Sequence, residues 1–246
     1  MITRVAVVPQ PPLLVPELVA GEDPDALRVR AECLAVGAGL AAAARRWVAI
    51  AVDAGASDDL DAPTVVGPHA AGTFRGYGVD VRVGLAAGAD LPPDPALPLP
   101  ALVAGWLRAA SGAEQVRVWM VPPRLPATDC RGFGERVGAE LGGGEPVGLL
   151  VIGDGSHRHG ERAVGRPDER AAGFDEQVRL ALAAADPEAL FAVDAEVAAE
   201  LGAVGRAAWH ILSGVMAKDG RSWECTHSRL LIPFGVAYHF AIWDPR

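Results

Sequence analysis

The side chains best suited to chemistry gather directly after one apolar run. Val147–Ile152 contains no charged residue, lies between Pro146 and Gly153, and is followed by a segment rich in glycine and polar residues. Such a run is typical of a strand buried on both faces of a parallel sheet. In open α/β sheets, ligands bind beyond the carboxyl ends of the strands, so we expect the polar side chains of this segment to line a binding crevice. These side chains are Asp154, Ser156, His157 and His159.

Proton transfer is the chemistry that His157 suits best. A histidine at the end of a strand needs only modest tuning to exchange protons near neutral pH, although it could equally be a loop histidine that only bonds the backbone. For His159 we expect the second role. Together with Glu161 or Asp154, the two histidines also offer nitrogen and oxygen ligands for zinc or iron. No second cluster such as His-Glu-x-x-His accompanies them, which favours a solvated polar loop over a metal site.

Spacing disfavours two other interpretations of the segment. A dinucleotide-binding motif needs its third glycine three residues after the second, but Gly160 follows Gly155 by five positions. A nucleophilic serine of the hydrolase type needs a glycine two residues on each side, and the sequence around Ser156 lacks this pattern. We therefore expect neither a nicotinamide cofactor nor a serine nucleophile.

A further polar residue is expected at the same edge of the sheet. Val5–Val8 is predicted as the first buried strand, and it ends at Pro9 because prolines cannot donate to a strand ladder. Gln10 follows this strand as the histidines follow Val147–Ile152. The two loops are therefore predicted to face one crevice.

The remaining pattern predicts alternating strands and helices. Asp23 and Pro24 are typical of a helix start, and the alanine-rich segment after them leads to the apolar run Trp47–Val52. We expect one domain, residues 1–246, with a three-layer α/β fold: a central, mostly parallel sheet and helices on both faces. Other expected elements are strands at Thr64–Val66, Val79–Val83, Val116–Val121, Arg221–Thr226 and Val236–Trp243, helices at Leu99–Ala110, Asp129–Leu141 and Phe174–Ala185, and helix starts at Asp186 and Asp194.

Composition narrows the classes of partner. The 246 residues carry a net charge of −9, half of them are hydrophobic, and no basic stripe with interleaved aromatics occurs, so nucleic acid is not an expected partner. No apolar stretch reaches 18 residues and none resembles a signal peptide, so we expect a cytoplasmic protein without a membrane partner. Cys33, Cys130 and Cys225 lie far apart, and their odd number argues against a disulfide framework.

Four stretches spread over most of the chain carry a family resemblance. They are Val7–Leu14, Gly153–His157, Ala207–Leu212 and Ile232–Tyr238. Together they resemble the catalytic B subunit of the class III extradiol ring-cleavage dioxygenases (the LigB-like superfamily), above all an uncharacterised actinobacterial branch. The resemblance implies an α/β fold of the type found in that subunit.

For the active members, the resemblance implies a non-haem Fe(II) ion held by two histidines and a glutamate. Open coordination positions take the catecholate and O₂, and a separate histidine acts as acid or base. Gln10 stands where the first histidine ligand is expected, and a neutral amide is a poor ligand for Fe(II). The second should follow the second strand, but the segment Asp53–Leu60 contains no histidine. His157 resembles the acid/base histidine by its place after a strand.

The carboxylate ligand implied by the resemblance has one best candidate. Glu224 is the best placed near the C-terminus, ahead of Asp219 and Asp244. One ligand position is thus replaced and another lacks a histidine, so the resemblance predicts a degenerate iron site.

Three functional hypotheses follow. The first is a protein without a cofactor that binds a small aromatic-type ligand or does metal-free chemistry, with His157 as the catalytic residue. The second is an active Fe(II) dioxygenase that cleaves a catecholic substrate with substitute ligands. The third is a structural or partner-binding protein that uses an exposed apolar surface of the tryptophan-rich section 209–243; a homo-oligomer is compatible with each. The crevice of the first hypothesis is lined by Gln10, Asp154, Ser156, His157 and His159. The substitute ligands of the second are His69, His157 or His159, together with Glu224.

Overall fold

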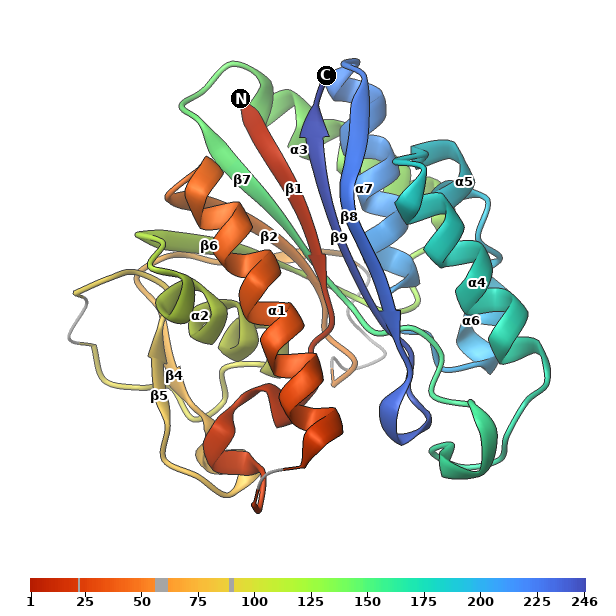
Figure 1. Ribbon diagram of the computed structural model, residues 1–246. Coiled ribbons are helices and arrows are strands. Elements are labelled where there is room, and N and C mark those ends of the chain that lie inside the picture. The colour runs from red at the N-terminus through yellow and green to blue at the C-terminus, as the bar shows by residue number, and fades with distance from the viewer. Residues whose placement is uncertain (22, 56–61, 89–90) are drawn as a thin grey trace.

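A seven-stranded sheet forms the centre of the computed structural model, which describes residues 1–21, 23–55, 62–88 and 91–246 (Figure 1). The strand order is β3-β6-β2-β7-β1-β9-β8. These strands are β1 (Ile2–Val8), β2 (Arg46–Val52), β3 (Thr64–Val66), β6 (Gln115–Val121), β7 (Val147–Ile152), β8 (Trp223–Leu231) and β9 (Tyr238–Pro245). A small second sheet pairs β4 (Ala71–Thr73) with β5 (Arg82–Gly84).

Four strands, β6, β2, β7 and β1, run parallel at the centre of the large sheet, and β3, β9 and β8 are antiparallel at its margins. Every residue of β7 is buried, as the uncharged run predicts. Ile152 pairs with Val8 on one side and with Ala51 on the other, so β1, β2 and β7 end at the same level. We call this end of the sheet the carboxyl edge, and the opposite end the amino edge.

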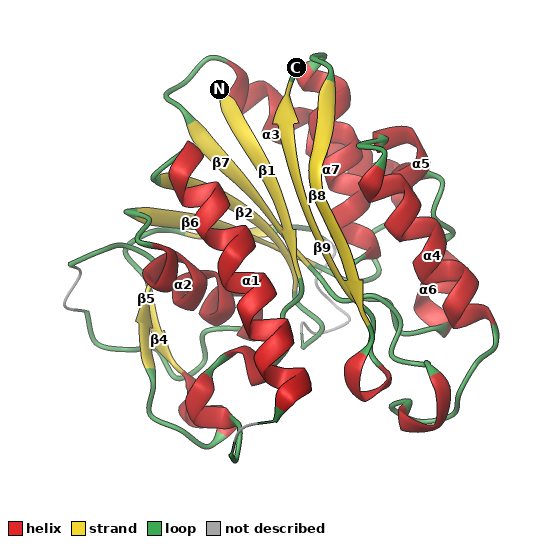
Figure 2. Ribbon diagram, in the orientation of Figure 1, coloured by secondary structure: helices red, strands yellow, loops and turns green. Residues whose placement is uncertain are grey.

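Helices cover both faces of the sheet (Figure 2). One face packs against α1 and α2, and the other against α3 and α7 with α4 to α6 beside them. The prediction of an α/β fold with a mostly parallel central sheet is confirmed at this level. The helices are α1 (Pro24–Ala43), α2 (Leu99–Ser111), α3 (Ala127–Gly142), α4 (Arg170–Ala183), α5 (Pro187–Phe191), α6 (Ala195–Glu200) and α7 (Arg206–Asp219).

Three of the helices begin at aspartates, as the sequence predicts. The carboxylate of Asp23 accepts hydrogen bonds from the backbone N–H groups of Asp25 and Ala26, both at 2.9 Å. Asp186 and Asp194 cap α5 and α6 in the same way. Each aspartate satisfies N–H groups that have no partner within the first turn of the helix.

Helix α7 was not predicted. Its residues from Arg206 to Met216 are buried without exception, so no polar face marks a helical period in the sequence. Its neighbour α3 approaches it closely: a Cβ on Gly134 would lie 2.1 Å from the backbone oxygen of Ile211. The glycines of α3 therefore allow two helices to pack backbone to backbone.

Strand boundaries differ from the prediction in two places. Val79–Val83 was expected as a strand, but β5 includes only its last two residues and Gly84. Strand β8 begins two residues after Arg221 and continues to Leu231, through residues that were expected to form a connection. β8 is an edge strand whose exposed positions carry polar side chains, so no apolar run marks its full length.

The tryptophans of the C-terminal section are internal. Trp209 and Trp243 are fully buried and Trp223 is 8% exposed. These three tryptophans therefore contribute almost nothing to an apolar surface of the section 209–243.

Two expectations from composition can be compared with the structure. All three cysteines are free. Within the described ranges, no helix is both long and apolar enough to cross a membrane.

Candidate functional site

Asp154 and Gln10 meet at the carboxyl edge. The backbone N–H of Gln10 donates to Oδ1 of Asp154 at 2.8 Å. Strand β9, the other neighbour of β1, begins at Tyr238, so a third strand also has an end at this edge. The two loops predicted to share a crevice therefore do lie side by side.

The environment of Asp154 changes its acidity. Burial raises the pKa of its carboxyl group to about 7, and the hydrogen bond from Gln10 opposes this shift. The residue still keeps part of its surface accessible. Burial and the neighbouring Asp154 carboxylate also raise the pKa of Tyr238. Asp154 is thus poised to gain or lose a proton near neutral pH.

A pocket of about 700 Å³ opens beside Gln10, and we call it the edge pocket. Its polar lining residues are Gln10, Asp53, Thr73 and Tyr77, and its apolar wall comes from the start of α2 and the residues before it. The residues that line it are Gln10, Asp53, Ala54, Gly55, Thr73, Gly76, Tyr77, Pro95, Ala96, Leu97, Pro98, Leu99, Pro100 and Leu102. Part of the predicted Asp53–Leu60 loop, residues 56–60, lies outside the described residues.

Only one of the two polar atoms of the Gln10 amide has a hydrogen-bond partner among the described residues. Its Nε2 donates to the backbone oxygen of Val52 at 3.2 Å, which fixes the orientation of the amide. Its Oε1 is buried and has no hydrogen-bond donor among the described residues. Tyr77, across the edge pocket, has its pKa raised by burial and by Asp53. The residues that line the pocket thus include an amide with an unpaired oxygen, a carboxylate and a phenol.

Ser156 points away from this site. Its hydroxyl donates to the backbone oxygen of Leu201 at 3.0 Å and accepts from the backbone N–H of Arg158 at 3.1 Å. The side chain is fully buried. Its contacts hold the loop in shape and leave no hydroxyl for a ligand in the edge pocket.

The contacts of His157 also lie elsewhere. Its Nδ1 is 3.0 Å from the backbone oxygen of Val164, and its ring lies over Gly202, where a Cβ would be 1.8 Å from Nε2. These contacts fit the alternative role given above, a loop histidine that only bonds the backbone. The structure brings Gln10 and Asp154 together and does not place the His157 ring among their contacts.

His159 belongs to a buried cluster that was not predicted. Its Nε2 lies 2.7 Å from one carboxylate oxygen of Asp175, and Nε2 of His239 lies 2.8 Å from the other. Both nitrogens must donate to an ionised carboxylate. Burial raises the pKa of Asp175, but the hydrogen bonds from the two histidines outweigh burial and lower it.

Backbone and aromatic contacts complete this cluster. The N–H of Ser156 lies 3.3 Å from both oxygens of Asp175, and the ring of Trp209 meets that of His239 edge to face. Asp175 is on α4 and His239 on β9, so no local spacing joins them. The isolated His239 within an otherwise apolar strand was the only signal in the sequence.

The described residues do not form the iron site that the resemblance implies. β3 runs antiparallel to β6, so His69 lies toward the amino edge, and it is exposed. Glu224 pairs with Asp244 at the amino edge and forms an ion pair with Arg246. Both are at the end of the sheet opposite Asp154. Within the described ranges, no three His, Cys, Asp or Glu side chains are grouped as metal ligands.

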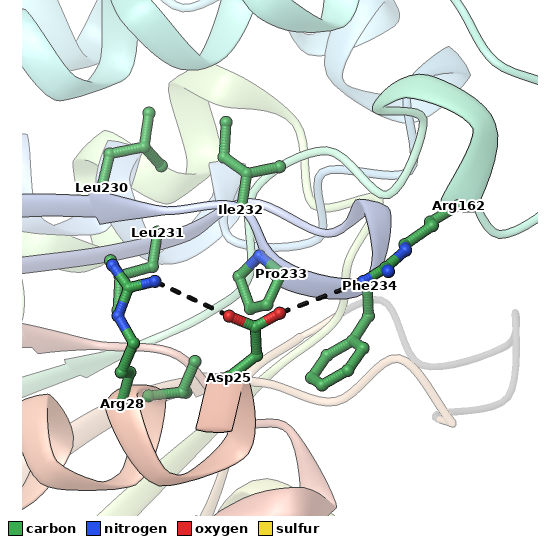
Figure 3. Close-up of a pocket in the computed structure, with 9 residues that line it drawn as sticks. Asp25, Arg28, Arg162, Leu230, Leu231, Ile232, Pro233 and Phe234 are labelled. Atoms are coloured by element: carbon green, nitrogen blue, oxygen red, sulfur yellow. Dashed lines mark ion pairs between the residues drawn. The ribbon is translucent and has the colours of Figure 1, made fainter. Parts of the chain in front are cut away.

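A second hollow, of about 260 Å³, lies between α1 and the turn that joins β8 to β9 (Figure 3). Figure 3 shows Asp25 between two arginines: Arg28 lies 3.6 Å and Arg162 3.9 Å from its carboxylate. Phe234 borders the hollow with a left-handed φ of 56°. Because both arginines are exposed and share a carboxylate, the hollow offers little binding energy for a further ion.

Comparisons with known proteins bear on the fold. No protein-family model and no curated protein matches the chain. Among solved structures, an uncharacterised protein from Escherichia coli K12 is similar with a TM-score of 0.52 and 13% sequence identity, over 98% of this chain and 99% of that chain. At this identity the similarity concerns the fold alone, and it supports the arrangement of strands and helices described above.

Proposed function

We propose that the protein binds a small hydroxylated aromatic molecule in the edge pocket without a metal ion. The observation that carries this proposal is the amide of Gln10, a residue that lines the pocket and whose buried Oε1 has no partner in the described chain. Leaving such a group unpaired costs about 1–3 kcal/mol. A hydroxyl group of a ligand that donates to this oxygen removes the penalty.

The rest of the pocket supports the same class of ligand. Asp53 offers a carboxylate for a second hydroxyl group, and Tyr77 offers a phenol. Leucine and proline side chains from Leu97 to Leu102 provide an apolar wall for a ring. In this proposal the chain is a relative of the extradiol dioxygenases in which Gln10 binds the ligand directly instead of a metal ion.

Titration calorimetry tests the proposal with catechol as the probe and EDTA present. We expect saturable binding of catechol to the wild type. Binding to Gln10→Leu should be at least about tenfold weaker, because this variant loses one hydrogen bond between neutral groups. Gln177→Leu is the matched control, because Gln177 is exposed on α4 and remote from the pocket in sequence and sheet position. Catechol binding that appears only when Fe(II) replaces EDTA would contradict the proposal and revive the dioxygenase hypothesis.

A second candidate function is metal-independent proton transfer by Asp154. The observation that favours it is the pKa of about 7 beside Gln10 at the carboxyl edge. We expect the protein to speed exchange of ring hydrogens of bound resorcinol with D₂O, followed by NMR. Asp154→Asn should abolish the catalysed exchange and His157→Ala should retain it; the reverse result would return the role to His157.

A further inference from the structure

Arg206 is a buried cation at the start of α7. The residue is 5% exposed. Its Nη1 donates to the backbone oxygen of Leu125 at 2.6 Å, and its Nη2 donates to that of Pro123 at 2.7 Å. These bonds satisfy part of the guanidinium group but bring no negative charge to it. In proteins, a buried charge is normally paired with an opposite charge.

No counter-ion for Arg206 is found in the part of the chain that the structure describes. Among the described residues, its one side-chain partner is the sulfur of Cys130, 3.7 Å from Nη1. Burial raises the pKa of that thiol to about 11, so it is neutral. The positive charge of Arg206 also acts on His210: burial and repulsion from Arg206 lower the pKa of His210 to about 4.

Arg206 borders a cavity of about 170 Å³ that is separate from the edge pocket. The cavity lies between α6, the turn after β6 and the loop that leads into α7. Most of its wall is made of small apolar groups, and Gly202 and the exposed Arg124 also line it. The apolar residues are Pro123, Ala195, Ala198, Ala199, Ala203 and Val204. It also lies at the N-terminal end of α7, where no side chain caps the helix, so the helix adds to the positive potential.

We propose that this cavity, the Arg206 pocket, binds a small carboxylate with a short apolar chain. The carboxylate lies against the guanidinium of Arg206, where it supplies the missing counter-charge in a charge-assisted hydrogen bond. The chain lies among the alanine methyl groups. The apolar walls and the small volume select a short-chain carboxylate over an inorganic anion, which has no apolar part to bury.

The Arg206 pocket is joined to the loop of Asp154. The α6–α7 loop, which lines the pocket, begins at Leu201. The backbone oxygen of Leu201 accepts hydrogen bonds from the hydroxyl of Ser156 and from the backbone N–H of His157. The N–H of Gly205 donates to the backbone oxygen of Asp154 at 2.8 Å. A ligand in the pocket therefore contacts the segment that holds the Asp154 loop, and amide resonances of both loops report its binding.

NMR titration of the full chain with butyrate tests the proposal. We expect saturable shifts of the α6–α7 loop with a Kd on the order of 1 mM, the range of a small ligand with few contacts. Butyramide, which has the same shape without the charge, and inorganic phosphate, which has charge without the chain, should each bind at least about tenfold more weakly. Equal binding of butyramide, equal binding of phosphate, or no saturable shift with butyrate would overturn the proposal.

Two variants locate the site. Ala199→Phe places a large side chain at the rim of the pocket from an exposed position of α6, and it should abolish butyrate binding. Ala192→Phe, at an exposed position that does not line the pocket, is the matched control. Arg206→Gln should weaken binding at least about tenfold; if it does not fold, Ala199→Phe still decides. Butyrate binding that survives Ala199→Phe would place the ligand elsewhere and refute the assignment.

Discussion

The backbone N–H of Gln10 donates to the carboxylate of Asp154 at 2.8 Å, across 144 positions of sequence. This bond joins the loops that leave β1 and β7, the two central strands that end beside each other. It favours the ionised form of Asp154, but burial acts in the opposite direction and prevails, so the pKa rises to about 7. The charge at the carboxyl edge therefore changes near neutral pH.

The first prediction concerns the pH dependence of stability that Asp154 causes. In the unfolded chain an aspartate has a pKa of about 3.9, so the folded state binds the extra proton between this value and about 7. The stability linked to that proton is fully present below pH ~4 and is lost as the pH rises through ~7. We expect Asp154→Asn to remove this loss, because an amide stays neutral and can still accept from Gln10.

Chemical denaturation at pH 5 and pH 8 measures the effect. The free energy of unfolding of Asp154→Asn, relative to the wild type, should increase between pH 5 and pH 8. Asp168→Asn serves as a control, since the half-buried Asp168 has its pKa lowered by Arg170 and does not titrate in this range. A constant difference between Asp154→Asn and the wild type over this range would show that Asp154 is ionised throughout.

The second prediction concerns the buried Asp175 cluster. In Asp175→Asn, an amide NH₂ group faces at least one histidine Nε2–H that donates to Asp175 in the wild type. We expect a loss of about 3–5 kcal/mol in the free energy of unfolding at pH 7, the range for breaking a buried charge pair. Because the pKa of Asp175 is lowered, its stabilising effect is present above pH ~4 and is lost at lower pH.

Glu176→Gln is the neighbouring control for the Asp175 substitution. Glu176 is exposed and pairs with Arg179 on the surface of α4, so its loss should change the free energy of unfolding very little. Urea denaturation of both variants gives the comparison. Similar stabilities for the two variants would mean that the cluster is not ionised in the folded state.

Local signals in the sequence were sufficient for most elements of the fold. The uncharged run Val147–Ile152 marks a central strand, and Asp23 marks a helix start, because each pattern reflects the burial or the free N–H groups of a few consecutive residues. The meeting of Gln10 and Asp154 followed from a rule about where parallel strands end. These inferences need no knowledge of how distant elements pack.

The contacts that the sequence did not predict depend on packing between distant elements. Asp175 meets His239 across 64 positions, and the contact requires both the rotation of α4 and the place of β9 in the sheet. Likewise, the ring of His157 turns to Gly202 because the α6–α7 loop lies beside it. A position after a strand indicates that a residue reaches the carboxyl edge, but it does not fix the direction of the side chain.

The third prediction concerns Gly155, which allows the backbone to approach Asp175. A Cβ at this position would lie 2.3 Å from Oδ1 of Asp175 and 2.9 Å from Cβ of Ala237. Since both neighbours are held in the core, we expect Gly155→Ala to lower the free energy of unfolding by about 1–3 kcal/mol. Gly173→Ala, on the exposed face of α4 with no atom within 4 Å, should raise it by up to ~1 kcal/mol. Thermal denaturation of the two variants should therefore give shifts of opposite sign.

The fourth prediction concerns acid sensitivity at His210. Its Nε2 lies 3.0 Å from the backbone oxygen of Val193, so the neutral ring donates there, while burial and the charge of Arg206 lower its pKa to about 4. An unfolded histidine has a pKa of about 6.5, so unfolding takes up a proton between these values. The folded state therefore loses stability as the pH falls from ~6.5 to ~4, by roughly 3 kcal/mol in all.

This loss has the opposite sign to the effect of Asp154 over the same pH range, and His210→Gln separates the two. Glutamine can donate to Val193 but does not titrate, so the variant should lose less stability than the wild type between pH 7 and pH 5. Urea denaturation across this range provides the comparison. If His210→Gln takes up as many protons on unfolding as the wild type does, the ring of His210 is already protonated in the folded protein. A protonated His210 would in turn require a counter-charge near Arg206.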